Sequence, residues 1–190
     1  STDDLKAFAQ TGTGKTAAFS LPILQLLDTN SNNVQAIILS PTRELAAQVH
    51  KNVVDYSQFL DIKSTVIFGG VNAKPQIKSL KYGVDVVVAT PGRLLDLIDQ
   101  RALSLGRVDI LVLDEADRML DMGFLRDIKK IIAMMPKKRQ NLLFSATFSK
   151  EIKKLAEGIL HQPILVEAEP ENSTAEMVAQ KAYRVDKNDK

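Results

Sequence analysis

The chain has 190 residues, 45% hydrophobic and 25% charged, a balance typical of one globular domain with a sizeable core. It has no cysteine, which excludes disulfides and thiolate metal sites, and it shows neither a bilayer-spanning apolar run nor a signal-peptide pattern. We therefore expect a cytoplasmic protein with no membrane partner, and a net charge of +2 leaves any nucleic-acid site to be argued from local residues.

Short apolar runs alternate with helical patterns along the chain. Continuous apolar runs joined by helices indicate an α/β fold, a doubly wound, mostly parallel sheet of about seven strands with helices on both faces. The expected strands are residues 5–9, 36–40, 64–68, 85–89, 110–114, 141–145 and 163–167. The expected helices include 16–27, 44–60, 124–135 and 149–160, and residues 28–35 are expected to form a polar loop.

In the helix expected at 44–60, one apolar face is predicted to be buried. It consists of Leu45, Val49, Val53, Tyr56 and Leu60. The first strand, 5–9, is likewise expected to be buried. Ligands of such sheets bind at the carboxyl ends of the strands, so polar motifs that directly follow a strand are the candidates for function.

The first such motif is AQTGTGKT at 9–16, which follows the first strand and opens a helix. It matches the phosphate-binding pattern of Gly, four residues, Gly-Lys-Ser/Thr, except that Ala9 replaces the first glycine. Gly12 and Gly14 let backbone N–H groups converge on an anion, Lys15 is placed for the β- and γ-phosphates, and the Thr16 hydroxyl for Mg²⁺. The nucleotide-binding set is Ala9, Gln10, Thr11, Gly12, Thr13, Gly14, Lys15 and Thr16. The alternative is an ordinary Gly-rich turn.

The second motif, ILVLDEAD at 110–117, is an apolar strand that ends in carboxylates. In this arrangement Asp114 holds Mg²⁺, largely through water, and Glu115 orients or deprotonates the attacking water. Asp117 is placed to keep neighbouring loops in register. The alternative is an acidic first turn of the next helix, which the helix dipole favours.

These motifs together resemble the first RecA-like domain of a DEAD-box RNA helicase. DEAD stands at 114–117, PTRELAAQ at 41–48 resembles motif Ia, FGG at 68–70 the GG motif, TPGR at 90–93 motif Ib, and SAT at 145–147 motif III. The family's phosphate loop also carries Ala where the general pattern has Gly. The resemblance runs from about Asp4 to Val166. Stretches such as RMLDMGF and KKRQNLLFSATFS are most similar to the bacterial RhlE-like subgroup.

The resemblance implies an ATP-dependent RNA helicase that uses ATP and Mg²⁺ and grips the RNA backbone. Lys15, Asp114 and Glu115 would then be catalytic. The residues implied in RNA binding are Pro41, Thr42, Arg43, Gly69, Gly70, Thr90, Pro91, Gly92 and Arg93. Each has a structural alternative: Thr42 as a helix cap, Arg93 paired with an acidic neighbour, and the glycines as a tight turn.

The SAT motif is expected to couple the nucleotide site to domain closure. The Ser145 and Thr147 hydroxyls would hydrogen-bond the Asp–Glu cluster, and together with Asp117 they form the coupling set. The competing interpretation is that Thr147 or Ser149 caps the following helix.

The resemblance also predicts a domain organisation. Residues 1–166 are expected to form a RecA-like domain that lacks an upstream Q motif, and residues 167–190 a linker towards a second RecA-like domain of the same parent chain. We accordingly expect the isolated chain to hydrolyse ATP very slowly and to discriminate poorly between ATP and GTP. Two alternatives stay open: an ATP-gated RNA clamp or assembly platform, and a P-loop ATPase acting on DNA or protein.

Overall fold

A computed structural model describes residues 3–9 and 14–167 of the chain, and in these ranges strands and helices alternate. The strands are β1 (Leu5–Phe8), β2 (Ala36–Leu39), β3 (Ser64–Ile67), β4 (Val86–Ala89), β5 (Ile110–Leu113), β6 (Gln140–Ser145) and β7 (Ile164–Glu167). The helices are α1 (Lys15–Leu26), α2 (Arg43–Ser57), α3 (Ala73–Lys81), α4 (Pro91–Asp99), α5 (Ala116–Asp121), α6 (Leu125–Ala133) and α7 (Lys150–Ile159).

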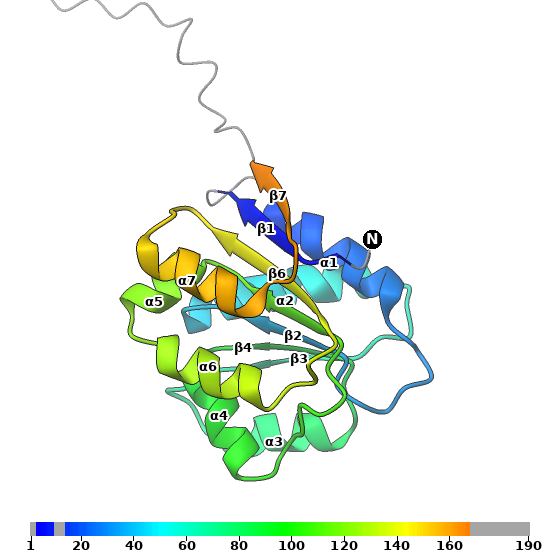
Figure 1. Cartoon of the computed structure of the whole chain (residues 1–190). Helices are drawn as coiled ribbons and strands as arrows, with labels where there is room; N and C mark the ends of the chain where they lie inside the picture. The colour runs from blue at the N-terminus through cyan, green and yellow to red at the C-terminus, as the bar shows by residue number, and fades with distance from the viewer. Residues whose placement is uncertain (1–2, 10–13, 168–190) are drawn as a thin grey trace, which may run out of the picture.

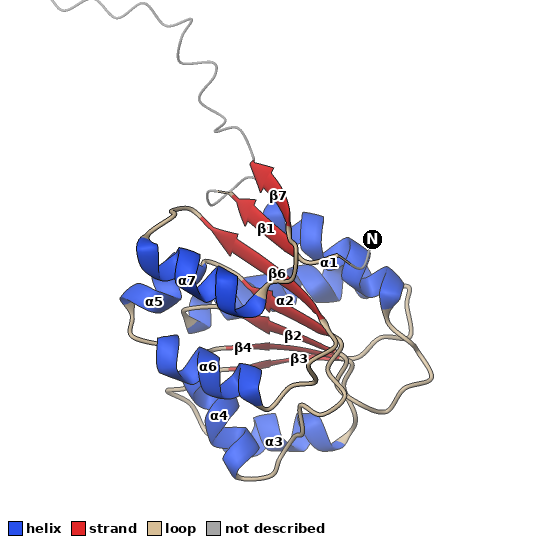
Figure 2. Ribbon diagram, in the orientation of Figure 1, coloured by secondary structure: helices blue, strands red, loops and turns tan. Residues whose placement is uncertain are grey.

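The strands form a seven-stranded sheet in the order β3-β4-β2-β5-β6-β1-β7, and every pairing is parallel. Helices cover both faces, with α5, α6 and α7 on the near side in Figures 1 and 2 and α2 behind the sheet. The predicted doubly wound α/β fold is confirmed. Because all the strands run the same way, the motifs that follow them share one edge.

The hydrophobic core consists of two layers, one on each face of the sheet. Alternate residues of a strand point to opposite faces, so Ile38 and its neighbours Ile37 and Leu39 belong to different layers. One layer joins the sheet to α1 and α2 through Phe19, Ile23, Val49 and Val53. The other joins it to α4, α6 and α7 through Leu94, Leu97, Ile128, Ile131 and Leu155.

The buried face of α2 differs from the one predicted. Its buried residues are Ala46, Val49, Val53 and Ser57, whereas Tyr56 and Leu60 are 37% and 47% exposed. The helix ends at Ser57, before Leu60 could extend the stripe. The small side chains at both ends of the observed stripe allow α2 to lie against β3 and β4.

The sheet is less covered at the β1–β7 edge than the sequence predicts. In β1 only Ala7 is buried, and all four residues of β7 are exposed. β7 is an edge strand that pairs only with β1, and its side chains find little cover at this end of the sheet. Glu167, expected to open the linker, is the last residue of β7, and residues 168–190 lie outside the described ranges. Within those ranges no helix combines the length and apolar character needed to cross a bilayer.

Candidate functional site

The strand order sorts the sequence motifs into two groups along the carboxyl edge of the sheet. The adjacent strands β5, β6 and β1 lead to the DEAD motif, the SAT motif and the phosphate loop. The adjacent strands β2, β4 and β3 lead to PTRE, TPGR and the GG motif. Residues implied in nucleotide chemistry therefore lie on one half of the edge, and residues implied in RNA binding on the other half.

Backbone hydrogen bonds tie these strand ends together beyond the regular sheet. Ala9 N donates to Ser145 O over 3.2 Å, and Asp114 N donates to Leu39 O over 2.9 Å. Further along the edge, Ser40 N donates to Ala89 O and Thr90 N to Ile67 O, each over 2.9 Å. The main chain of each motif is thus bonded to the end of a neighbouring strand.

The phosphate loop enters α1 through a left-handed residue. Gly14 has φ +74°, a conformation that glycine adopts without steric cost, and α1 begins at the next residue. Ala9 is buried beside the SAT strand, and Thr16 is partly buried in the first turn of the helix. The remaining predicted loop residues, Gln10, Thr11, Gly12 and Thr13, lie outside the described residues.

Lys15 lies between two carboxylates of the DEAD motif. Its Nζ is 3.2 Å from Asp114 Oδ1 and 3.6 Å from Glu115 Oε1, with only 9% of the Lys15 side chain and 2% of the Asp114 side chain exposed. Burial raises the pKa of Asp114, and the attraction of Lys15 only partly opposes this. Although Lys15 is close, Asp114 Oδ1 lacks a well-directed hydrogen bond. The site therefore holds a buried oxygen with unused acceptor capacity.

Glu115 has an unusual backbone conformation for a residue with a side chain. Its φ is +51° and ψ +53°, in the left-handed region, directly before α5. Such residues persist where the surrounding structure holds them, and they are concentrated at functional sites. Arg118 Nη1 lies 3.4 Å from Glu115 Oε2. This partner was not predicted from the sequence, although a spacing of three residues at the start of a helix is a usable signal.

The SAT loop reaches the DEAD motif through Thr147. The Thr147 hydroxyl donates to Asp117 Oδ2 over 3.1 Å, while Ser149 caps α7 by accepting from Ile152 N over 3.2 Å. Ser145 does not contact the acidic cluster as expected, because its hydroxyl donates to Thr147 O over 2.9 Å. It therefore shapes the loop that carries Thr147.

The three motifs implied in RNA binding lie side by side. A Cβ atom placed on Gly70 would lie 3.8 Å from Arg43 Nη1, and Gly70 itself has φ +79°. Arg93 Nη2 donates to Val71 O over 3.0 Å, and its Nε lies 3.3 Å from an oxygen of Asp96. PTRE, the GG motif and TPGR thus form one continuous surface.

The residues of this surface differ in their availability to a ligand. Arg43 and the backbone at Gly70 and Gly92 are exposed, and Gly69 is partly buried. Thr42 caps α2 by accepting from Leu45 N over 3.3 Å. Pro41, Thr90 and Pro91 are buried and shape the turns rather than present side chains to solvent. The predicted cap at Thr42 is therefore confirmed, while Arg43 beside it stays exposed, and its contact with RNA stays a prediction.

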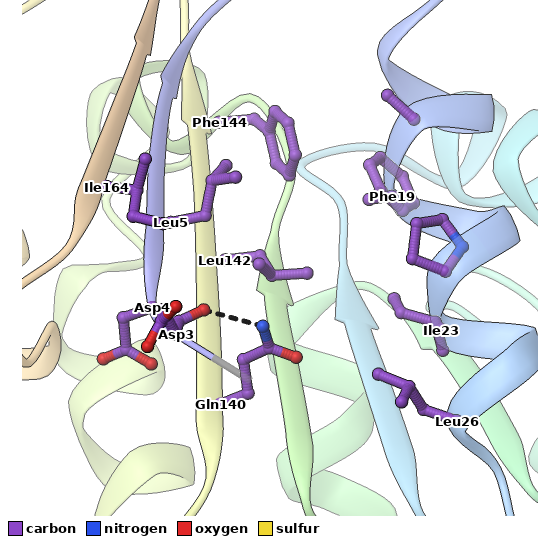
Figure 3. Close-up of a pocket in the computed structure, with 12 residues that line it drawn as sticks. Asp3, Asp4, Leu5, Phe19, Ile23, Leu26, Gln140, Leu142, Phe144 and Ile164 are labelled. Atoms are coloured by element: carbon purple, nitrogen blue, oxygen red, sulfur yellow. Dashed lines mark hydrogen bonds between the residues drawn. The ribbon is translucent and has the colours of Figure 1, made fainter. Parts of the chain in front are cut away.

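A separate cavity of about 230 Å³ lies between α1 and the sheet, as Figure 3 shows. It is lined by apolar residues such as Phe19, Ile23 and Leu142, and by Gln140, whose Nε2 donates to Asp3 O over 2.7 Å. Leu5, Gln140 and Ile164 in its wall begin their strands, so it opens at the amino edge of the sheet. It lies at the opposite edge from Lys15 and Asp114.

Comparison with known families agrees with this geometry. The model of the family described as DEAD/DEAH box helicase matches residues 1–155. The chain belongs to this family. The DEAD-box chain is also similar to curated relatives, among them the ATP-dependent RNA helicase CshA of Listeria monocytogenes, 46% identical over 98% of this chain and 36% of the relative. The RNA helicase CrhR of Synechocystis is 46% identical over 96% of this chain and 37% of the relative.

Solved structures show the same fold. A DEAD box protein from the hyperthermophile Methanococcus jannaschii aligns with a TM-score of 0.84 and 42% identity, over 88% of this chain and 46% of that one. A structure described as a hypothetical ATP-dependent RNA helicase from Sulfolobus tokodaii aligns with a TM-score of 0.80. The DEAD-box chain spans about a third of the length of CshA and CrhR. The narrower RhlE-like resemblance stays a prediction, since neither relative carries that name.

Proposed function

We propose that this DEAD-box domain is the ATP-binding half of an ATP-dependent RNA helicase, which couples ATP binding and hydrolysis to clamping of an RNA strand and local duplex unwinding. The observation that carries the proposal is the position of the Lys15 ammonium, 3.2 Å from Asp114 and 3.6 Å from Glu115. One buried cation and two carboxylates at the start of a helix are the parts that phosphoryl transfer uses.

Residues 9–16 would hold the phosphates of ATP, with Lys15 beside the β- and γ-phosphates. Backbone N–H groups at the start of α1 favour an anion there, and Gly14 provides the turn that exposes them. Glu115 would accept the proton of the attacking water, for which its position beside Asp114 is suited. Arg118, 3.4 Å from Glu115, would orient that carboxylate.

The residues at the site fit a magnesium ion. Asp114 Oδ1 is a buried carboxylate oxygen 3.2 Å from Lys15 Nζ that keeps unused acceptor capacity, and hard cations prefer oxygen ligands. Among the described residues no group of three or more His, Cys, Asp or Glu could form a complete metal cage. This agrees with Mg²⁺, which is usually held by one or two carboxylates, phosphates and water. Asp114 and the Thr16 hydroxyl would hold it, and the ion would neutralise charge developing on the phosphates.

The RNA backbone would lie on the surface formed by Arg43, Gly70 and Arg93. Arg43 is 57% exposed and pairs with Glu44, 70% exposed, so its guanidinium is easily released to a phosphate. Gly70 and Gly92 would let the strand approach the main chain closely. The bond between Thr147 and Asp117 would relay the state of the nucleotide site to the position of the domain.

The proposed helicase has a second RecA-like domain, which residues 168–190 would join to the domain that ends with β7 at Glu167. The greater length of CshA and CrhR supports this organisation. Because the second domain would supply the arginine that stabilises the transferring phosphoryl group, residues 1–190 alone should be slower by about 10³–10⁵-fold.

The decisive experiment measures ATP turnover by the full-length protein, with and without RNA, for the wild type and Glu115→Gln. The variant keeps the shape of the side chain but removes the base, so turnover should fall by about 10²–10⁴-fold while RNA stimulates the wild type. Glu151→Gln, an exposed change on α7, is the matched control. Wild-type turnover in Glu115→Gln would refute the role of this residue, and stimulation by DNA alone would refute the choice of RNA.

A further inference from the structure

Phe148, the residue after the SAT motif, lies against the strand that leads into the phosphate loop. The centroid of its ring is 3.4 Å from that of Phe8, and the ring planes meet at 42°. Lys6 Nζ lies 3.9 Å from the centroid of the Phe148 ring, in a cation–π contact. Lys6 and Phe8 are two residues apart on β1, so both point to the same face of the sheet.

The loop that carries Phe148 is bonded to both halves of the nucleotide site. On one side, Ser145 O accepts from Ala9 N over 3.2 Å, at the entrance to the phosphate loop. On the other side, Thr147 reaches Asp117 of the DEAD motif over 3.1 Å. Thr147 and Phe148 lie between two fixed points, Ser145 at the end of β6 and Ser149 at the cap of α7.

Within this short loop, the ring of Phe148 provides the apolar anchor. Ala146 and Thr147 are exposed, whereas Phe148 is partly buried against Phe8. The bond from Thr147 to Asp117 lies near the surface, where water competes for it, so it depends on the loop being held in place. The contact between the tilted rings of residues 8 and 148 joins two segments far apart in the chain and holds the loop against β1.

We infer that Phe148 is a positioning residue for ATP turnover, which acts through Phe8 and Lys6 to hold Thr147 in reach of Asp117; the inference rests on the proposed function. Phe148 is not among the residues proposed to hold the nucleotide or to take part in the reaction. The phosphate loop has its own anchors in α1 and in the contact between Lys15 and Asp114. Loss of the Phe148 ring therefore acts on the rate of turnover and leaves the affinity for ATP unchanged.

The test compares Phe148→Ala and Phe148→Tyr with the wild type in the full-length protein, measuring kcat and KM for ATP in the presence of RNA. The alanine variant should lose about tenfold in kcat, the scale of one aromatic contact, with KM within about twofold. The tyrosine variant keeps the stacked ring and should stay within about twofold of the wild type. Phe59→Ala, which removes a 90% exposed ring after α2, is the matched control.

A double variant separates positioning from general destabilisation. If Phe148 acts by placing Thr147, then Phe148→Ala combined with Thr147→Val should be no slower than the slower single variant. Fully additive losses would overturn the inference. It is also overturned if Phe148→Ala keeps the wild-type kcat, if its loss lies entirely in KM, or if Phe148→Tyr is as slow as Phe148→Ala.

Hydrogen exchange at the Ala9 amide provides a readout that does not depend on turnover. This amide follows Phe8 and donates to Ser145 O, so loss of the ring that packs on Phe8 in Phe148→Ala should speed its exchange by about tenfold, and Phe148→Tyr should restore protection. Failure of RNA to stimulate the wild type would refute the proposed function alone. The exchange rates would then decide the inference, which falls if the wild type and Phe148→Ala exchange equally fast.

Discussion

The Thr147 hydroxyl donates to Asp117 Oδ2 over 3.1 Å, and this bond joins the loop after β6 to the first turn of α5. Thr147→Val keeps the shape of the side chain but removes the bond. A hydrogen bond to a charged partner contributes about 1.5 kcal/mol, so RNA-stimulated turnover of the full-length protein should fall by about tenfold. The free energy of unfolding should fall by no more than the same amount, about 1.5 kcal/mol, because the bond is exposed to water.

Thr29→Val, the same substitution at an exposed threonine after α1, is the control for this change and should leave turnover unchanged. Equal turnover in Thr147→Val and the wild type would show that the bond has no part in the reaction.

The buried carboxylate of Asp114 is expected to lower the stability of the fold although ATP turnover requires it. Burial raises its pKa above the ordinary value of 3.8. The free energy of unfolding therefore decreases as pH rises from 3.8 to the folded pKa, because the unfolded chain loses this proton first. The pKa is raised despite the nearby Lys15, so the cost of burying the Asp114 charge exceeds the gain from the ion pair. In Asp114→Asn, Lys15 would still have the carboxylate of Glu115 at 3.6 Å. Asp114→Asn should therefore raise Tm at pH 7 without nucleotide, while ATP turnover is lost.

Calorimetry of Asp114→Asn beside Asp121→Asn, an exposed change on α5, measures this effect. A lower Tm in Asp114→Asn would mean that the contact with Lys15 outweighs the cost of burial.

Substitution of Arg43 tests whether the proposed surface binds RNA. Arg43→Gln removes one exposed cation beside Gly70. RNA affinity should fall to a similar degree for all RNA sequences, and the slope of log affinity against log salt should decrease by about 1, because one phosphate contact is lost. Fluorescence titration across a range of salt concentrations gives both quantities.

Lys51→Gln provides the comparison for Arg43, since Lys51 is an exposed cation on the same helix, paired with Asp55 at 2.6 Å. It lies two helical turns beyond Arg43 and should leave both affinity and slope unchanged. Equal losses in the two variants would reduce the effect to overall charge and contradict a phosphate contact at Arg43.

Asp4 is predicted to stabilise the β1 side of the sheet. Its buried carboxylate accepts from Asn141 N and His161 N, each over 2.7 Å, and from Asn141 Nδ2 over 3.1 Å. Asp4→Ala leaves these donors without a partner, which should cost about 3 kcal/mol and lower Tm by about 6–12 °C. Thermal unfolding beside the exposed change Asp61→Ala measures it, and a shift no larger than that control would contradict the role.

His50 makes stability depend on pH. Burial lowers the pKa of its imidazole below the ordinary value of 6.5, and its Nε2 lies 3.1 Å from Ser64 Oγ. The unfolded chain takes up a proton near pH 6.5 that the folded chain takes up only at lower pH. The stability contributed by neutral His50 is therefore lost as pH falls below about 6.5.

Urea unfolding at pH 7.5 and 5.5 measures this contribution. The loss of unfolding free energy between the two pH values should be smaller in His50→Gln than in the wild type. An unchanged loss in the variant would assign the pH dependence to other groups.

The sequence predicted the strands well because each central strand is an uninterrupted apolar run, such as Val86–Ala89, buried on both faces. It predicted α3 poorly because Ala73–Lys81 is a short, polar stretch with a proline in it. This helix depends on an Asn72 cap that accepts from Lys74 N and on the bond from Gln76 to Phe68 O. Such contacts leave no periodic pattern in the chain.

Within the candidate site, the sequence predicted which residues would meet but not how they would bond. Strand ends fix the neighbourhood of Lys15, Asp114 and Thr147, so local motifs were sufficient. The bond of Ser145 to Thr147 O and the left-handed backbone of Glu115 depend on the course of individual turns. Buried polar pairs are harder still, since Gln35 and Asp85 meet across 50 residues and Asp4 and Asn141 across 137.

Hydrogen bonds between strand ends make the carboxyl edge of the sheet rigid. They join Ala9 to Ser145, Asp114 to Leu39, and Thr90 to Ile67. The half of the edge that carries the phosphate loop cannot slide past the half that carries PTRE and TPGR without breaking several of these bonds. In the proposed helicase this domain would therefore move as one rigid body, and the hinge of that motion would lie outside the sheet.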